Sequence, residues 1–217
     1  MLRKNYLRHM FADWLRFDIR FFQFLSIWNL PKIIRIYGWW TIIFWPFEWM
    51  LGLLHLIGFS HVAQPLLKNR STRRLNEREI NIAKSIFGDR LKYDLVSMNG
   101  SSRIARRLRI AFVTGNQINF NDKMSEPLLI HELTHIYQYQ QVGLVYIPRC
   151  LKAQYSREGY NFGEVVDHLD ILNGSTGLGK LNYEQQAEFL ETLYAQRATY
   201  TLASGLSGTF HNLNFTV

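Results

Sequence analysis

The sequence predicts an α+β fold in which a small mixed sheet and several helices follow a hydrophobic helical segment. Three observations support this prediction. Apolar residues recur at helical intervals in residues 75–87, 126–142 and 181–200. Short runs of strand-forming residues, closed by glycine-asparagine turn pairs, lie between the first two of these stretches. All six tryptophans lie between Trp14 and Trp49, so the beginning of the chain differs in kind from the rest.

Length, charge and cysteine content limit the possible classes of protein. The 217 residues suffice for one domain with a substantial core, or for a compact domain with an extra segment. The single cysteine, Cys150, excludes an internal disulfide. The net charge of +8 suits anionic lipid or nucleic acid. Because the later chain lacks a basic helix with interleaved base-stacking aromatics, we expect lipid as a partner and no nucleic acid.

Residues 1–66 form the first predicted domain and residues 67–217 the second. Residues 1–28 set scattered charges among Leu, Phe and Trp at helical intervals, which is typical of an amphipathic helix. A cleavable signal peptide would have an uninterrupted apolar stretch and a small-residue cleavage site, and this segment has acidic residues in its body instead. We therefore expect no cleavable signal peptide.

The stretch 38–63 is long enough to cross a bilayer but is a poor single span, because it contains Pro46, Glu48, His55 and His61. Basic residues flank it on both sides, so the positive-inside rule selects no orientation. This pattern predicts a membrane-associated segment that enters one leaflet or lies in the interface. The alternative is a hydrophobic arm that packs on the rest of the protein or forms a dimer contact.

The second domain begins with a predicted helix that Ser71 or Thr72 caps and Gly88 ends. Three strands are expected after it, at residues 91–98, 107–113 and 117–120. Asn99-Gly100 closes the first strand, and Gly115-Asn116 joins the other two.

The next predicted helix carries the main chemical motif. Ser125 suits its N-cap, Pro127 its first turn and Gly143 the position just past its end, which places the helix at 126–142. Leu129, Leu133 and Ile136 share an apolar face that anchors the helix in the core.

His131 and His135 lie four residues apart on this helix, so both imidazoles project from one face and can share one metal ion. Glu132 follows the first histidine. In the HExxH pattern of zinc hydrolases this glutamate reaches the water on the metal and acts as general base. The pattern therefore predicts Zn²⁺ as cofactor and Glu132 as the catalytic residue.

A catalytic zinc site needs a third protein ligand from elsewhere in the chain. The predicted helix at 181–200 carries Glu184 and Glu188 one turn apart, with Glu191 three residues further on. Two histidines, His168 and His211, are weaker rivals, because a lone histidine is more often a surface or core residue.

The segment "LLIHELTHIYQYQQVG", followed about fifty residues later by "YEQQAE", resembles the zincin-like metallopeptidase fold. It is similar in particular to small bacterial zincin-like domains associated with contractile or type VI secretion machinery. The resemblance covers about residues 72–200, with Tyr137 where such domains commonly have Trp. Its gluzincin arrangement implies that Glu184 binds the zinc and that Glu188 hydrogen-bonds a ligand histidine from the second shell. It also implies a bacterial protein at the inner membrane or its cytoplasmic face, with a possible secretion-system partner.

If the site is active, a peptide or protein is the expected substrate. Three residues are candidates, by residue type, for stabilising the oxyanion: Tyr160, His168 and Tyr183. The strand "QINF", residues 117–120, is expected to offer a free edge to an extended peptide. Two other interpretations stay open: a catalytically silent structural or targeting module of a secretion system or toxin, and a helical domain in which the histidines bind no metal.

Overall fold

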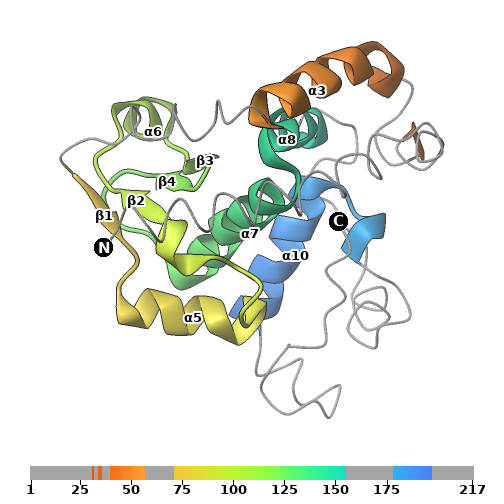
Figure 1. Ribbon diagram of the computed structural model, residues 1–217. Helices are drawn as coiled ribbons and strands as arrows, with labels where there is room; N and C mark the ends of the chain where they lie inside the picture. The colour runs from red at the N-terminus through yellow and green to blue at the C-terminus, as the bar shows by residue number, and fades with distance from the viewer. Residues whose placement is uncertain (1–30, 32–33, 36–39, 57–70, 155–177, 197–217) are drawn as a thin grey trace, which may run out of the picture.

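The computed structural model describes residues 31, 34–35, 40–56, 71–154 and 178–196. Within them the chain has the predicted α+β composition, with helices around a four-stranded mixed sheet. Helix α7 (Glu126–Val142) lies at the centre, between the sheet and α10 (Tyr183–Ala195), and α5 (Glu77–Phe87) packs beside it (Figure 1). The predicted candidates Tyr160, His168 and His211 lie outside the described residues.

The sheet has the strand order β1-β2-β4-β3, made of β1 (Thr72–Arg74), β2 (Ser97–Asn99), β3 (Phe112–Thr114) and β4 (Gln117–Asn119). β4 pairs in parallel with β2 and antiparallel with β3. The expectation that "QINF" offers a free edge is therefore wrong, because both sides of β4 are hydrogen-bonded to neighbouring strands. The antiparallel hairpin at Gly115-Asn116 is confirmed.

The first helix of this domain begins later than the sequence predicted. Thr72 lies in β1, which pairs with β2, and so neither Ser71 nor Thr72 caps a helix. Asn76 is the N-cap of α5: its side chain accepts from the backbone N–H of Glu79, whose carboxylate accepts from the backbone N–H of Asn76. This reciprocal capping box satisfies two N–H groups that the first turn leaves without helical partners.

The first and second predicted strands are shorter than expected. Of residues 91–98 only the last two lie in a strand, β2 (Ser97–Asn99), and Tyr93–Leu95 forms the 3-10 helix η2. Residues predicted to begin the second strand belong instead to α6 (Arg103–Leu108), which Ser102 caps. Arg109 ends α6 in the left-handed region at φ 57°. The capping serine and the run "RIARRL" were the signals for this helix that the strand prediction overlooked.

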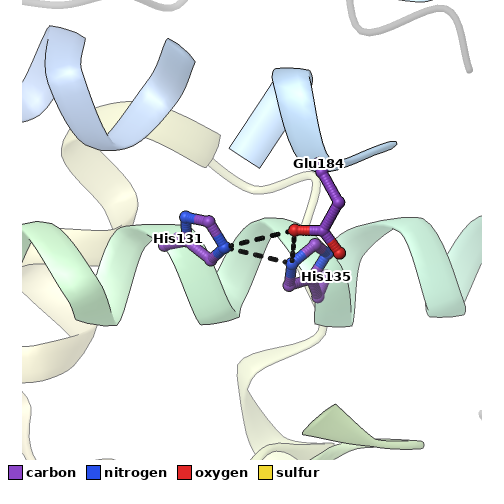
Figure 2. A group of neighbouring side chains, drawn as sticks. All are labelled: His131, His135 and Glu184. Carbon is purple, nitrogen blue, oxygen red and sulfur yellow. Dashed lines mark hydrogen bonds and ion pairs between the residues drawn. The ribbon is translucent and has the colours of Figure 1, made fainter. Parts of the chain in front are cut away.

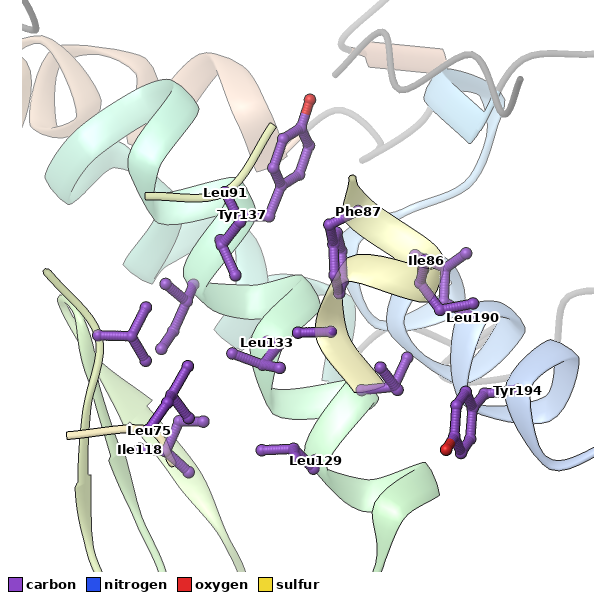
Figure 3. Packing of buried hydrophobic residues seen from close by; sticks show 14 of the residues in the cluster. Leu75, Ile86, Phe87, Leu91, Ile118, Leu129, Leu133, Tyr137, Leu190 and Tyr194 are labelled. Carbon is purple, nitrogen blue, oxygen red and sulfur yellow. The ribbon is translucent and has the colours of Figure 1, made fainter. Parts of the chain in front are cut away.

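The predicted helix 126–142 is confirmed as α7, with Ser125 at its N-cap and Gly143 at its C-cap. Leu129, Leu133 and Ile136 are buried, as the pattern predicted. The core around α7 draws side chains from the sheet, α5 and α10, including Ile118, Phe87 and Leu190 (Figure 3). This packing on several sides makes α7 a rigid support for the polar groups that it carries.

Two further helical elements complete the second half. The 3-10 helix η3 (Gly143–Val145) leads into α8 (Tyr146–Gln154), and η4 (Leu178–Lys180) precedes α10. Helix α10 is shorter than the predicted stretch 181–200, because the Asn182 side chain caps it and Gln196 ends it. Most of the packing surface of α10 faces α7, so the two candidate motifs lie against each other.

Helix α3 (Trp40–Leu56) comes from the predicted hydrophobic segment and packs on η3. Its Glu48 carboxylate receives two hydrogen bonds from Arg149 of α8, with Oε2 to Nη2 at 2.9 Å and Oε1 to Nε at 3.3 Å. Both side chains are buried. Gly143 has φ +62°, and a Cβ there would lie 2.5 Å from the His55 ring, so only glycine fits at this junction. No helix among the described residues has the length and apolarity needed to cross a bilayer.

Candidate metal centre

Helices α7 and α10 bring His131, His135 and Glu184 together in the protein interior (Figure 2). The Nε2 atoms of the two histidines lie 3.2 Å apart. Glu184 Oε2 lies 3.4 Å from His135 Nε2 and 3.7 Å from His131 Nε2. The four-residue spacing on α7 sets the histidine pair, and the first turn of α10 supplies the carboxylate. These three residues could hold one metal ion.

Acceptor oxygens on the far side of each ring indicate where its proton lies. His135 Nδ1 is 2.9 Å from Gln138 Oε1, and His131 Nδ1 is 2.9 Å from Glu191 Oε2. Both partners are acceptors, so each Nδ1 carries hydrogen and each neutral ring keeps its Nε2 lone pair for the centre. Two Nε2 lone pairs 3.2 Å apart repel each other unless a proton or a metal ion lies between them.

Gln138 has its amide orientation fixed by α10. Its Nε2 donates to the backbone oxygen of Tyr183 at 3.0 Å and to Gln186 Oε1 at 2.9 Å. Because the NH₂ group is used by these two carbonyl oxygens, Oε1 must face His135. Gln138 is fully buried, so this network connects the histidine helix to the carboxylate helix away from solvent.

The electrostatics of the three residues favour a cation. Burial lowers the pKa of His131, but the Glu184 and Glu191 carboxylates outweigh it and raise that pKa to about 10. Burial raises the pKa of Glu184, yet the two imidazoles hold it well below its ordinary value. Glu184 Oε2 is buried and accepts no hydrogen bond from a described residue, although it faces both imidazoles. A buried ionised oxygen aimed between two imidazole nitrogens fits a metal ligand.

Glu132, the predicted general base, is 4% exposed on the same helix. Its Oε2 is buried without a hydrogen-bond partner among the described residues. Burial raises the pKa of this carboxyl, while the neighbouring histidines oppose the shift. A carboxyl with a raised pKa and a free oxygen is suited to accepting a proton in a neutral solution.

Cys150 of α8 contacts the carboxylate from the other side. Its Sγ–H donates to Glu184 Oε1 at 2.7 Å, in the interior. Burial and the adjacent Glu184 raise the pKa of Cys150 well above its ordinary value, so the thiol is neutral and able to donate. The two oxygens of Glu184 therefore have different partners: Oε1 accepts from Cys150, and Oε2 faces the histidines.

The two remaining acidic residues of α10 lie at different distances from His131. Glu191 Oε2 is 2.9 Å from His131 Nδ1, and Glu188 Oε2 is 3.9 Å from the same atom. Glu191, rather than the expected Glu188, is thus within hydrogen-bond distance of a histidine of the centre. Tyr183, a candidate oxyanion stabiliser, is buried, and its ring stacks on Tyr146 with centroids 6.1 Å apart. Burial raises the pKa of Tyr183 to about 12, which keeps its hydroxyl protonated.

The contacts of Gln138 with His135 and of Cys150 with Glu184 were not predicted from the sequence. Gln138 follows His135 by three residues, and this spacing on a helix was an available signal for a contact. For the Cys150 contact there was no such signal, because no sequence pattern connects Cys150 to Glu184, which lies 34 residues away.

No family model matches the chain, and no curated protein or solved structure matches it either.

Proposed function

We propose that the chain is a zinc-dependent metallopeptidase of the zincin-like, gluzincin type, with His131, His135 and Glu184 as the metal ligands. The observation that supports this most is the convergence of two Nε2 atoms and one buried carboxylate oxygen, with hydrogen-bond acceptors behind both rings. Such acceptors are usual around catalytic zinc, where they orient the rings and increase their basicity.

The kind and number of donors favour zinc. Two imidazole nitrogens and one carboxylate oxygen form a donor set found in zinc hydrolases, and three protein ligands leave one position for water. Ca²⁺ and Mg²⁺ prefer oxygen ligands and are poorly matched by two imidazoles. Zinc held here would supply Lewis-acid polarisation of a peptide carbonyl and lower the pKa of a bound water.

The chain's own residues supply the proton transfers and the orientation. Glu132, beside the centre on α7, accepts the proton of the attacking water and later delivers it to the leaving amine. Gln138 and Glu191 hold the two rings in the tautomer that turns Nε2 toward the centre. Cys150 holds one oxygen of Glu184 and leaves the other for the metal.

Glu132→Gln tests the proposal together with Glu184→Ala. We expect about one zinc per wild-type chain, measured by elemental analysis, and cleavage of a mixed peptide library, measured by mass spectrometry. Glu132→Gln should keep the zinc and lose about 10²- to 10⁴-fold in cleavage rate. Glu184→Ala should lose the zinc. Glu77→Gln removes an exposed carboxylate from α5 and should leave both properties unchanged.

The outcomes separate the remaining interpretations. Zinc in the wild type without any peptide cleavage would favour the alternative, a structural or targeting module with a secretion-system partner. A folded wild type without zinc would contradict both, and would leave the histidines as buried hydrogen-bonded residues.

A further inference from the structure

Helix α3 has its charge on the inside and four of its described large apolar residues on the outside. Glu48, the only charged residue of the helix, is 3% exposed and paired with Arg149. The outward side chains are instead apolar and about half exposed: Ile42, Phe47, Met50 and Leu53. A surface helix in contact with water normally shows the reverse arrangement. In helices that contact lipid, a charged side chain usually faces the protein interior and pairs with an opposite charge there.

Helices α8 and α6 also carry exposed large hydrophobic residues. Large hydrophobic residues that are exposed in the described part of the chain occur only on α3, on α8, and on α6 with the residue after its cap. On α8 they are Ile147 and Leu151, one turn apart; near α6 they are Ile104, Leu108 and Ile110. The exposed apolar side chains are therefore concentrated on three helices.

The three helices lie on one side of the molecule. In Figure 1, α6, α8 and α3 occupy the upper side, and α5 occupies the lower side. We call the exposed side chains of α3, α6 and α8 the upper surface.

Helix α6 adds positive charge to the upper surface. Four exposed arginines lie on it or at its C-cap: Arg103, Arg106, Arg107 and Arg109. None of the four is ion-paired with a described residue. Exposed aliphatic residues beside arginines without counter-charges are typical of segments that insert shallowly among anionic lipid headgroups.

We propose that the upper surface docks on an anionic lipid bilayer, with α3 and α8 in the headgroup region and the α6 arginines on lipid phosphates. A nucleic acid would use the arginines but leave the apolar side chains of α3 and α8 without a partner, and α6 offers no aromatic ring for base stacking. A second copy of the chain would bring the arginines of both copies into one interface, where like charges repel. An anionic bilayer offers acyl chains to the apolar side chains of α3 and α8 and phosphates to the arginines of α6.

Vesicle co-sedimentation of the full chain tests this surface. We expect binding to vesicles of phosphatidylcholine mixed with phosphatidylglycerol, and weaker binding to phosphatidylcholine alone. Arg106→Gln with Arg107→Gln should weaken binding to the anionic vesicles by about fivefold for each arginine. Leu53→Gln and Leu151→Gln should each weaken binding to both vesicle types by about tenfold. Circular dichroism checks that each variant is folded.

Two controls separate the upper surface from general charge and from the metal centre. Lys84→Gln with Arg90→Gln removes one exposed positive charge on α5, which lies on the lower side, and one three residues after α5 ends, and this variant should bind vesicles as the wild type does. Glu184→Ala should also bind normally, because this inference does not depend on the metal.

Three results would overturn the inference. The first is a wild type that does not bind anionic vesicles, and the second is folded upper-surface variants that bind as well as the wild type. The third is competition by another partner: tighter binding to a nucleic-acid duplex, or a dimer in light scattering that Leu53→Gln abolishes.

Discussion

Cys150 Sγ lies 2.7 Å from Glu184 Oε1, and both side chains are buried. The thiol therefore occupies one oxygen of the carboxylate whose other oxygen faces His131 and His135. This contact fixes the rotation of the carboxylate, and it predicts that a residue outside the HExxH motif contributes to metal affinity.

Cys150→Ala should weaken zinc binding by about 10- to 100-fold, the usual effect of removing a partner of a metal ligand. Cys150→Ser retains a donor and should stay within a few-fold of the wild type. Competition with a chromophoric chelator measures both affinities, and the visible spectrum of the cobalt-substituted protein reports any change in coordination. Equal losses in the two variants would show that the sulfur matters for packing and not as a donor.

Gln138→Ala removes the acceptor that orients His135 and should also weaken zinc binding by about 10- to 100-fold. It leaves the Tyr183 carbonyl without this donor, so unfolding should become easier by about 1–3 kcal/mol. Gln140→Ala is the matched control, because Gln140 lies on the same helix but bonds to Lys92 and Asn116, away from the centre. An equal loss of affinity in both variants would contradict the assigned role of Gln138.

Glu191→Gln and Glu188→Gln form a second matched pair. Since Glu191 is 2.9 Å and Glu188 is 3.9 Å from His131 Nδ1, the Glu191 variant should lose more zinc affinity. Isothermal titration of each protein with zinc gives the comparison. A larger loss in Glu188→Gln would restore the arrangement that the resemblance to gluzincins implied.

The metal affinity should rise with pH. Because the pKa of His131 in the metal-free protein is raised to about 10, zinc must displace a proton from this ring below that pH. The apparent affinity should increase by about tenfold per pH unit between pH 7 and 9. In the metal-free protein the sign is opposite: the stabilisation from protonated His131 is complete below its ordinary pKa of 6.5 and is lost as the pH rises through about 10. Thermal unfolding of the metal-free protein across this range checks the second part, and a pH-independent affinity would contradict the first.

The ion pair between Glu48 and Arg149 should matter most when only one partner is removed. Arg149→Met leaves a buried carboxylate without its counter-ion and should destabilise the protein by about 3–5 kcal/mol. Glu48→Leu combined with Arg149→Met should cost clearly less, because no charge is left buried. Arg78→Met breaks the exposed pair with Glu126 and should cost about 1 kcal/mol or less. Denaturant unfolding measures all three, and additive effects of the two buried changes would argue against the pair.

Local sequence signals predicted the parts of the fold that depend on local chemistry. Ser125 and Gly143 defined the ends of α7, and the Gly115-Asn116 pair identified the hairpin. The prediction was wrong where pairing with distant residues decides the structure. Thr72 joins a strand because β2 lies beside it, and β4 has no free edge because β2 inserts next to it.

In the candidate metal centre, too, local spacing was predictable from the sequence and contacts between distant residues were not. The spacing of His131 and His135 on one helix was readable from the sequence. The contacts of Glu191 and Cys150 depend on how α10 and α8 are rotated against α7, and packing sets that rotation. Residue spacing within α10 placed Glu188 and Glu191 on similar faces and could not rank their distances to His131.

The pairing of Glu48 with Arg149 has a consequence for the order in which the protein is made. The two residues are 101 positions apart, so α3 leaves the ribosome well before its counter-ion exists. At about 5–20 residues per second, the delay is roughly 5–20 seconds. During that interval the Glu48 carboxylate cannot form this ion pair. The contact between α3 and α8 is therefore completed only after about half of the chain has been added beyond α3.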